Sequence, residues 1–97
     1  LSNPLKEDSG MATVFIRHPV SDYDTWRPRY DEDAHRRDEA GLTEVGVFQD
    51  ASDPNSVLVV WNTDNVDGVE AMLADEDLEQ KMQDAGVLAP PEVWIAD

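Results

Sequence analysis

The side chain best suited to acid–base chemistry in this chain is His18, because an imidazole titrates near neutral pH. It ends a run in which Val14, Ile16 and His18 alternate, which places their side chains on one face of a strand. In that position His18 could act as a general base toward a phenolic substrate, or it could be a strand-end histidine satisfied by a backbone carbonyl. The second histidine, His35, lies among charged residues, and we expect it on the surface.

An aromatic stripe follows His18 along the chain. Tyr23, Trp26 and Tyr30 recur at helical spacing, so a helix could lay them over the strand face that carries His18. The stripe is either plain core or the lining of a pocket, since two hydroxyls and an indole N–H form a polar lining. A ligand site predicts an open cleft of roughly a few hundred cubic ångströms at His18. A cleft closed by Trp26 and Trp61 would instead favour a non-catalytic binding or interaction module.

Hydrophobic patterns and turn residues predict the elements that must position these side chains. We expect strands at 13–18, 42–49, 56–62 and 92–96, with helical segments between the first and second strands and between the third and fourth. Ser21 is expected to cap the first helix and Gly41 to end it. Pro28 should either bend that helix or separate a short turn from it. Residues 62–64 are expected to open the second helix, which residues 75–77 interrupt and Gly86 ends.

The order strand–helix–strand, strand–helix–strand, with a tight hairpin between the halves, predicts a ferredoxin-like βαββαβ fold of the α+β class. In it, a four-stranded antiparallel sheet carries both helices on one face. The third strand is apolar on both faces from Val57 to Trp61, which indicates a central strand covered on both sides. Because the helices cover one face only, a second copy would cover the other, and we expect a homodimer. Trp94 should pack internally or meet that partner.

Length and composition set the remaining limits. The 97 residues predict one domain, at 11–97, preceded by a disordered arm or vector-derived remnant at 1–10. The absence of cysteine excludes disulfides and thiolate metal sites. With no apolar run long enough to span a membrane and no leader pattern, the expected location is the cytoplasm.

The charge balance limits the possible partners. There are 22 Asp and Glu residues against 7 Lys and Arg, a formal net charge of −15. Such a chain should repel nucleic acid and anionic membranes, so neither is expected as a partner. An acidic, lysine-poor surface resembles those of proteins from salt-accumulating halophiles, with an ordinary acidic protein as the alternative.

The acidic clusters do not predict a metal site. The turn at 50–55 lacks the glycine and glutamate of a calcium loop, and the side chains of the acidic runs at 31–33 and 75–77 should point apart on helices. No metal is expected.

Three segments carry a resemblance to a known family. They are the strand-to-helix segment 18–26 (HPVSDYDTW), the helix end 37–41 (RDEAG) and the strand exit 59–63 (VVWNT). Together they resemble the dimeric α/β-barrel superfamily, which includes antibiotic-biosynthesis monooxygenases and haem-degrading monooxygenases. The resemblance covers residues 11–97 and implies a dimeric α/β barrel.

The resemblance also implies a function. Trp61 is similar to a tryptophan that these families place in a cofactor-free oxygenation cleft, so a small apolar or aromatic ligand is implied. If the chain is an enzyme, the chemistry would be cofactor-free monooxygenation or a related isomerisation. His18 or Tyr30 would then be catalytic and ionise a phenolic substrate. The implied substrate-binding residues are Tyr23, Trp26, Trp61 and Asn62.

Haem degradation is not expected. The haem-degrading members ligate iron through a histidine of the helix that follows this tryptophan, whereas the corresponding helix here offers no histidine from Val69 to Met72. The competing function is a non-catalytic binding or interaction module, in which side chains fill the cleft.

Overall fold

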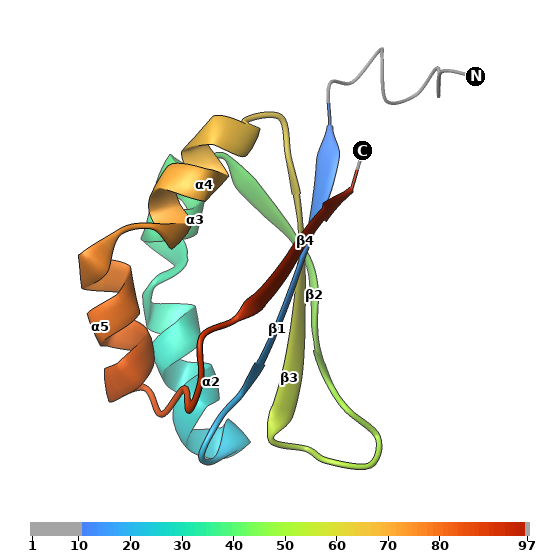
Figure 1. Cartoon of the computed structure of the whole chain (residues 1–97), viewed down its shortest axis with the longest axis vertical. Coiled ribbons are helices and arrows are strands. Elements are labelled where there is room, and N and C mark those ends of the chain that lie inside the picture. The colour runs from blue at the N-terminus through green and yellow to red at the C-terminus, as the bar shows by residue number, and fades with distance from the viewer. Residues whose placement is uncertain (1–10, 97) are drawn as a thin grey trace.

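The computed structural model of this chain describes residues 11–96, so the expected arm at 1–10 lies outside the described part. The described elements follow the order β1 (Ala12–Pro19), α2 (Tyr23–Glu32), α3 (Ala34–Glu39), β2 (Leu42–Gln49), β3 (Ser56–Thr63), α4 (Val66–Leu73), α5 (Glu76–Asp84) and β4 (Glu92–Ala96). The strands form one antiparallel sheet in the order β2-β3-β1-β4. The helices of the described part lie on one side of that sheet (Figure 1). The predicted ferredoxin-like fold is confirmed.

The strands agree closely with the prediction. β2 and β4 have the expected bounds, while β3 runs one residue further, to Thr63. β1 also extends further than expected, because Pro19 still pairs with Ser56 in the sheet register. A proline is tolerated there because it is the last residue of the strand, where its missing N–H interrupts no further pairing. A register shift between Glu44 and Gly46 forms a bulge in β2.

The helix starts correct two expectations. Asp22, and not Ser21, caps α2, and its Oδ2 accepts a hydrogen bond of 3.1 Å from the Thr25 amide. The reason is that the Ser21 amide donates to the Gly86 carbonyl at 2.8 Å, which ties Ser21 to the loop before β4. At the second helix the cap is Asn65, because β3 continues to Thr63 and so includes two of the three residues expected to open that helix.

The structure also shows where the helices break and end. Pro28 lies inside α2, and the helix breaks five residues later, at Asp33, which separates α2 from α3. Asp75 caps α5, so the expected interruption of the second helical segment is present. Gly41 and Gly86 have positive φ angles of 82° and 94° just after a helix, as the C-terminal ends of helices favour.

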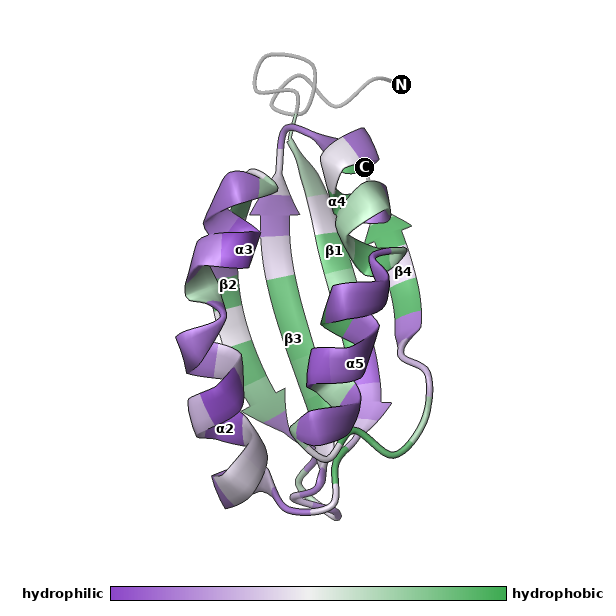
Figure 2. Cartoon of the chain, turned by 90° about the vertical axis from the view of Figure 1, so that its left-hand side faces the viewer, coloured by the Kyte–Doolittle hydropathy of each residue, from purple (hydrophilic) through white to green (hydrophobic). Residues whose placement is uncertain are grey.

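The two faces of the sheet differ in cover. The inward residues of β1 and β3 are buried beneath the helices, and the core they share includes Val14, Ile16, Val57, Val59, Val69 and Met72. Figure 2 shows the apolar centre of β3 and β1 between the pair α2–α3 and the pair α4–α5. On the opposite, open face, Phe48 and Trp94 are each 51% exposed. Among residues 11–96, no helix combines the length and apolar character needed to cross a membrane.

Candidate functional site

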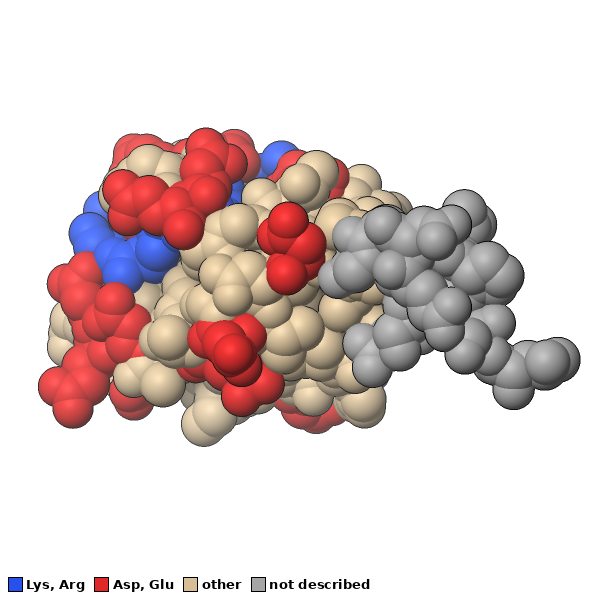
Figure 3. Space-filling model, turned by 90° about the horizontal axis from the view of Figure 1, so that it is seen from above, with Lys and Arg blue, Asp and Glu red and all other residues tan. Residues whose placement is uncertain are grey.

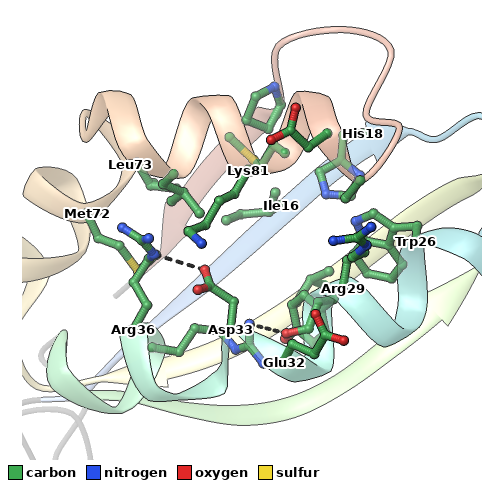
Figure 4. Close-up of a pocket in the computed structure, with 18 of the residues that line it drawn as sticks. Ile16, His18, Trp26, Arg29, Glu32, Asp33, Arg36, Met72, Leu73 and Lys81 are labelled. Atoms are coloured by element: carbon green, nitrogen blue, oxygen red, sulfur yellow. Dashed lines mark hydrogen bonds and ion pairs between the residues drawn. The ribbon is translucent and has the colours of Figure 1, made fainter.

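A cavity of about 360 Å³ lies between the two helix pairs, above the helix-covered face of the sheet. Its floor consists of Ile16 and His18 from β1 and Val59 and Trp61 from β3. Figure 4 shows His18 and Trp26 at one end and Met72 and Leu73 at the other. Because inward residues of two neighbouring strands form the floor, the pleat of the sheet fixes which side chains a ligand would meet.

His18 is the buried titratable group of the floor. Its side chain is 5% exposed, and its Nδ1 has no hydrogen-bond partner among residues 11–96. Burial lowers the pKa of His18 below its usual 6.5, with a weaker opposing contribution from its own backbone. The ring is therefore neutral at pH 7, with one nitrogen able to accept a proton. Its edge meets Trp26, with ring centroids 5.4 Å apart and planes at 73°.

Aromatic stacking forms the wall contributed by α2. Trp26 is buried, and its ring stacks on Tyr30 at 4.9 Å between centroids with planes 29° apart. The Arg37 guanidinium lies 3.6 Å from the centroid of the Tyr30 ring, and its Nη1 donates to the Tyr30 carbonyl at 2.9 Å. Stacking and a cation over the ring together hold Tyr30 in place.

The Tyr30 hydroxyl is already occupied by protein partners. It accepts a hydrogen bond of 2.9 Å from Trp61 Nε1 and donates one of 2.7 Å to Glu44 Oε1. Burial, reinforced by the Glu44 carboxylate, raises the pKa of Tyr30 well above its usual value, although the Trp61 hydrogen bond opposes the shift. Tyr30 is therefore a neutral hydroxyl that orients Trp61, and it is poorly suited to accept a proton from a substrate.

The wall opposite α2 comes from α4 and α5 and is mostly apolar. Met72 and Leu73 of α4 face the cavity together with Leu78, Met82 and Ala85 of α5. The two thioether side chains can adapt to different ligand shapes, because Met has flexible, unbranched rotamers. One side of the cavity is thus rigid and aromatic, while the other is aliphatic and adaptable.

Charged side chains surround the cavity opening. Arg36 connects the two helix pairs: its Nε is 2.9 Å from Asp33 Oδ2, its Nη1 is 3.1 Å from Asp75 Oδ2, and its Nη2 pairs with Asp77. Further basic and acidic side chains at the opening are Arg29, Arg37, Lys81, Glu32 and Asp84. No group of three or more His, Asp or Glu residues within 11–96 is arranged to hold a metal ion.

Of the six predicted site residues, four lie together and two do not. The cavity brings together His18, Trp26, Tyr30 and Trp61. Tyr23 packs behind Trp26 at 5.9 Å between centroids, and its hydroxyl accepts from Arg27 Nη1 at 3.2 Å.

Asn62 belongs to the other face of the sheet. It pairs with Thr13, whose Oγ1 donates to Asn62 Oδ1 at 3.1 Å. As the neighbour of the inward Trp61, it must point outward. Its predicted place in the cleft is therefore wrong.

Sequence reasoning missed several contributors to the site. Glu44 is directly opposite Trp61 in the register of β2 and β3, and a carboxylate on the inward side of a strand was the available signal. Arg29 follows Trp26 by three residues, so helical spacing alone brings it to the same side of α2. Lys81 likewise follows Leu78 by three residues, which brings both to the same side of α5.

Solved structures share this fold at low sequence identity. A putative antibiotic biosynthesis monooxygenase from Bordetella bronchiseptica aligns with a TM-score of 0.73 and 15% identity, covering 91% of this chain and 96% of that one. The cofactor-independent oxygenase SnoaB from Streptomyces nogalater aligns with a TM-score of 0.67 and 13% identity, covering 91% and 92%. A putative antibiotic biosynthesis monooxygenase from Chloroflexus aurantiacus aligns with a TM-score of 0.63 and 18% identity, covering 89% and 90%.

Sequence comparison adds no relative. No family model matches the sequence, and no curated protein matches it. At these identities the shared feature is the backbone arrangement, and a fold can host several activities. The chain has the ferredoxin-like fold of the antibiotic biosynthesis monooxygenase-like proteins.

Proposed function

We propose that this chain binds a compact aromatic molecule in the cavity between its helix pairs and acts on it as a cofactor-free monooxygenase. The observation that carries the proposal is the buried His18 ring, whose Nδ1 has no partner among the described residues, on the floor of a cavity of about 360 Å³. The His18 ring lines the cavity, so a hydroxyl ligand bound there would meet a neutral imidazole. A cavity of this size suits a molecule of one to three fused rings.

A phenol with a free para position illustrates the chemistry. His18 accepts the hydroxyl proton of 1-naphthol, and the naphtholate adds dioxygen at its fourth carbon, forming a C–O bond. The peroxide takes the proton back from His18, and the resulting hydroperoxide loses water to give 1,4-naphthoquinone, so one dioxygen is consumed and one water released per quinone. A neutral imidazole is the form that can take the proton, and burial keeps His18 in that form near pH 7.

The other cavity residues have supporting roles in this proposal. Trp26 and Trp61 supply flat surfaces for the aromatic ring, and Tyr30 holds Trp61 through its hydrogen bond. The similarity to the cofactor-independent oxygenase of Streptomyces nogalater supports this proposal, since the folds are alike. An isomerase that uses the same proton transfer is the nearest alternative chemistry.

We also propose that the open face of the sheet joins two copies into a homodimer. Phe15, Phe48, Leu58 and Trp94 line a groove on that face, and both Phe48 and Trp94 are half exposed. Exposed aromatic side chains clustered on one sheet face are typical of association surfaces. The net charge of −15 suits a protein that works at high salt, where such charges are screened.

The experiment compares wild type with His18→Ala. Both are titrated with 1-naphthol by calorimetry, and oxygen uptake is followed with 1-naphthol as substrate. We expect His18→Ala to weaken binding and to reduce uptake at least about a hundredfold, the usual contribution of a general base. Normal binding and no uptake by wild type would favour the non-catalytic binding module. The absence of binding by wild type would refute the proposal.

A further inference from the structure

We infer that the cavity selects aromatic ligands that carry one negative charge, with Arg29 and Lys81 holding the anionic group at the opening. This inference rests on the proposed function, because it concerns the ligand of the same cavity. It adds a charge requirement that neither His18 nor the aromatic walls would impose.

The distribution of charge in the chain is the first observation. The whole chain has 22 acidic residues against 7 Lys and Arg, a ratio of about three to one. The cavity reverses this excess: its lining contains four basic side chains and three acidic ones. In Figure 3, which views the molecule from above, the largest group of basic side chains lies on the helix side, between acidic groups. An acidic protein thus concentrates its few cations around one opening.

The pairing of these charges is the second observation. Arg36 forms ion pairs with three carboxylates, those of Asp33, Asp75 and Asp77. Arg37 is committed to the Tyr30 ring and carbonyl. Of the four basic residues at the opening, two remain for a ligand.

Arg29 and Lys81 are those two cations. Within residues 11–96 neither side chain makes a hydrogen bond or an ion pair, although Lys81 acts electrostatically on Asp77 one turn earlier. Glu32 and Asp84 of the lining form no ion pair with any described residue, and the Asp84 carboxylate accepts a hydrogen bond from Gln80. Because Arg36 is already surrounded by three carboxylates, a second negative charge on the ligand would find no further cation among the described lining residues. Direct contact with Arg29 and Lys81 therefore suits a monoanion and disfavours a dianion.

The placement of the two cations is the third observation. Arg29 extends from α2 one turn after Trp26, and Lys81 extends from α5 between Leu78 and Ala85 of the aliphatic wall. They therefore come from opposite helix pairs, and Figure 4 shows Arg29 beside Trp26 and Lys81 beside Ile16. A flat ring between the walls would leave its anionic group within reach of a cation from each side. A guanidinium binds a carboxylate through two parallel hydrogen bonds, and an ammonium adds a third donor.

The test uses two probes of nearly equal shape, the anion 2-naphthoate and the neutral 2-naphthamide. Calorimetric titration at 0.15 M salt and pH 7.5 should show 2-naphthoate binding about tenfold tighter, as one charge-assisted contact allows at a partly exposed site. The double variant Arg29→Gln/Lys81→Gln should lose that preference while still binding 2-naphthamide as wild type does. The matched control is Arg27→Gln, which removes a cation from α2 outside the cavity and should keep the preference.

The outcomes separate the inference from the proposed function. Equal affinity for the two probes in wild type that binds 1-naphthol would overturn the charge requirement and leave the proposed function standing. A preference that survives in the double variant would overturn the assignment to Arg29 and Lys81. Failure of wild type to bind 1-naphthol and both probes would overturn the proposed function, and the inference with it. Raising the salt concentration should weaken the binding of 2-naphthoate but not that of 2-naphthamide, which checks the result without any substitution.

Discussion

The two faces of the sheet use the same strands for different purposes. On the helix-covered face, His18 and Trp61 lie buried at the floor of a cavity. On the open face, Phe48 and Trp94 are half exposed over a shallow groove. β1 serves both, since Ile16 and His18 face the helices while its alternate residues face outward. The comparison teaches that a period of two lets one short strand line a buried cavity on one face and an exposed aromatic surface on the other.

The largest expected effect comes from removing a tryptophan from the covered face. Trp26→Ala should lower the free energy of unfolding by about 3–5 kcal/mol, because the indole is buried against His18 and Tyr30. Urea denaturation measures it. The matched control is Trp94→Ala, which removes the same side chain from the open face and should cost the monomer less than about 1 kcal/mol. Equal losses would show that the two faces do not differ as described.

A charge on the open face should separate the proposed dimer without disturbing the cavity. Trp94→Glu places a carboxylate where a second copy would pack, and a buried unpaired charge is strongly unfavourable. Light scattering at micromolar concentration should give twice the chain mass for wild type and the single-chain mass for the variant. Titration with 1-naphthol should be unchanged. A wild type that is monomeric in molar potassium chloride would remove the association role of this face.

Salt should stabilise both faces together. The net charge of −15 repels itself at low ionic strength, where the screening length is about 30 Å at 0.01 M. The urea midpoint should therefore rise steeply between dilute buffer and molar potassium chloride. A midpoint that does not change over this range would contradict adaptation to high salt.

The fold followed from the sequence because its boundaries are marked by residues with strong local preferences. Gly41 ends α3 with a positive φ angle, and the turn after β2 uses Asp50, whose Oδ1 accepts from the Ser52 amide at 2.7 Å. Helix starts were less predictable, because Ser21 and Asp22 are both good caps and a long-range contact of Ser21 decides between them. Local chemistry offers the candidates, and tertiary contacts select one.

The candidate site was only half predictable. The alternation of β1 placed His18 inward, and helical spacing placed Trp26 and Tyr30 over it. The same alternation excludes Asn62, which follows the inward Trp61, so this error came from extending a family resemblance beyond the strand period. The cavity itself could not be predicted, because its volume depends on how far apart two helix pairs settle on the sheet.

The protonation of His18 should give the covered face a pH dependence that the open face lacks. Since burial lowers the pKa of His18, the folded protein binds fewer protons than the unfolded chain just below pH 6.5. This contribution is fully present above pH 6.5 and is lost as the pH falls, by up to about 1.4 kcal/mol per pH unit. Urea denaturation between pH 7 and 5 measures it. His18→Phe should flatten the slope in that range, whereas His35→Gln, which changes a largely exposed ring, should retain it.

The smallest effect is expected for the Tyr30 hydroxyl. Tyr30→Phe removes its hydrogen bonds to Trp61 and Glu44, which should cost about 1 kcal/mol by urea denaturation. Because the hydroxyl is neutral and already engaged, oxygen uptake with 1-naphthol should fall far less than in His18→Ala. A loss of uptake equal to that of His18→Ala would return Tyr30 to the catalytic role that the sequence suggested.

The most direct measurement of the central claim is the nitrogen NMR spectrum of the two histidine rings with and without 1-naphthol. The chain contains only His18 and His35, so the signals can be assigned with one variant. We predict that His18 is neutral at pH 7 and that its ring nitrogen signals shift when 1-naphthol is added, because the ring lines the cavity that the ligand would occupy. His35, largely exposed, should not change. A His18 ring that is charged at pH 7, or signals that stay fixed under saturating 1-naphthol, would contradict the account.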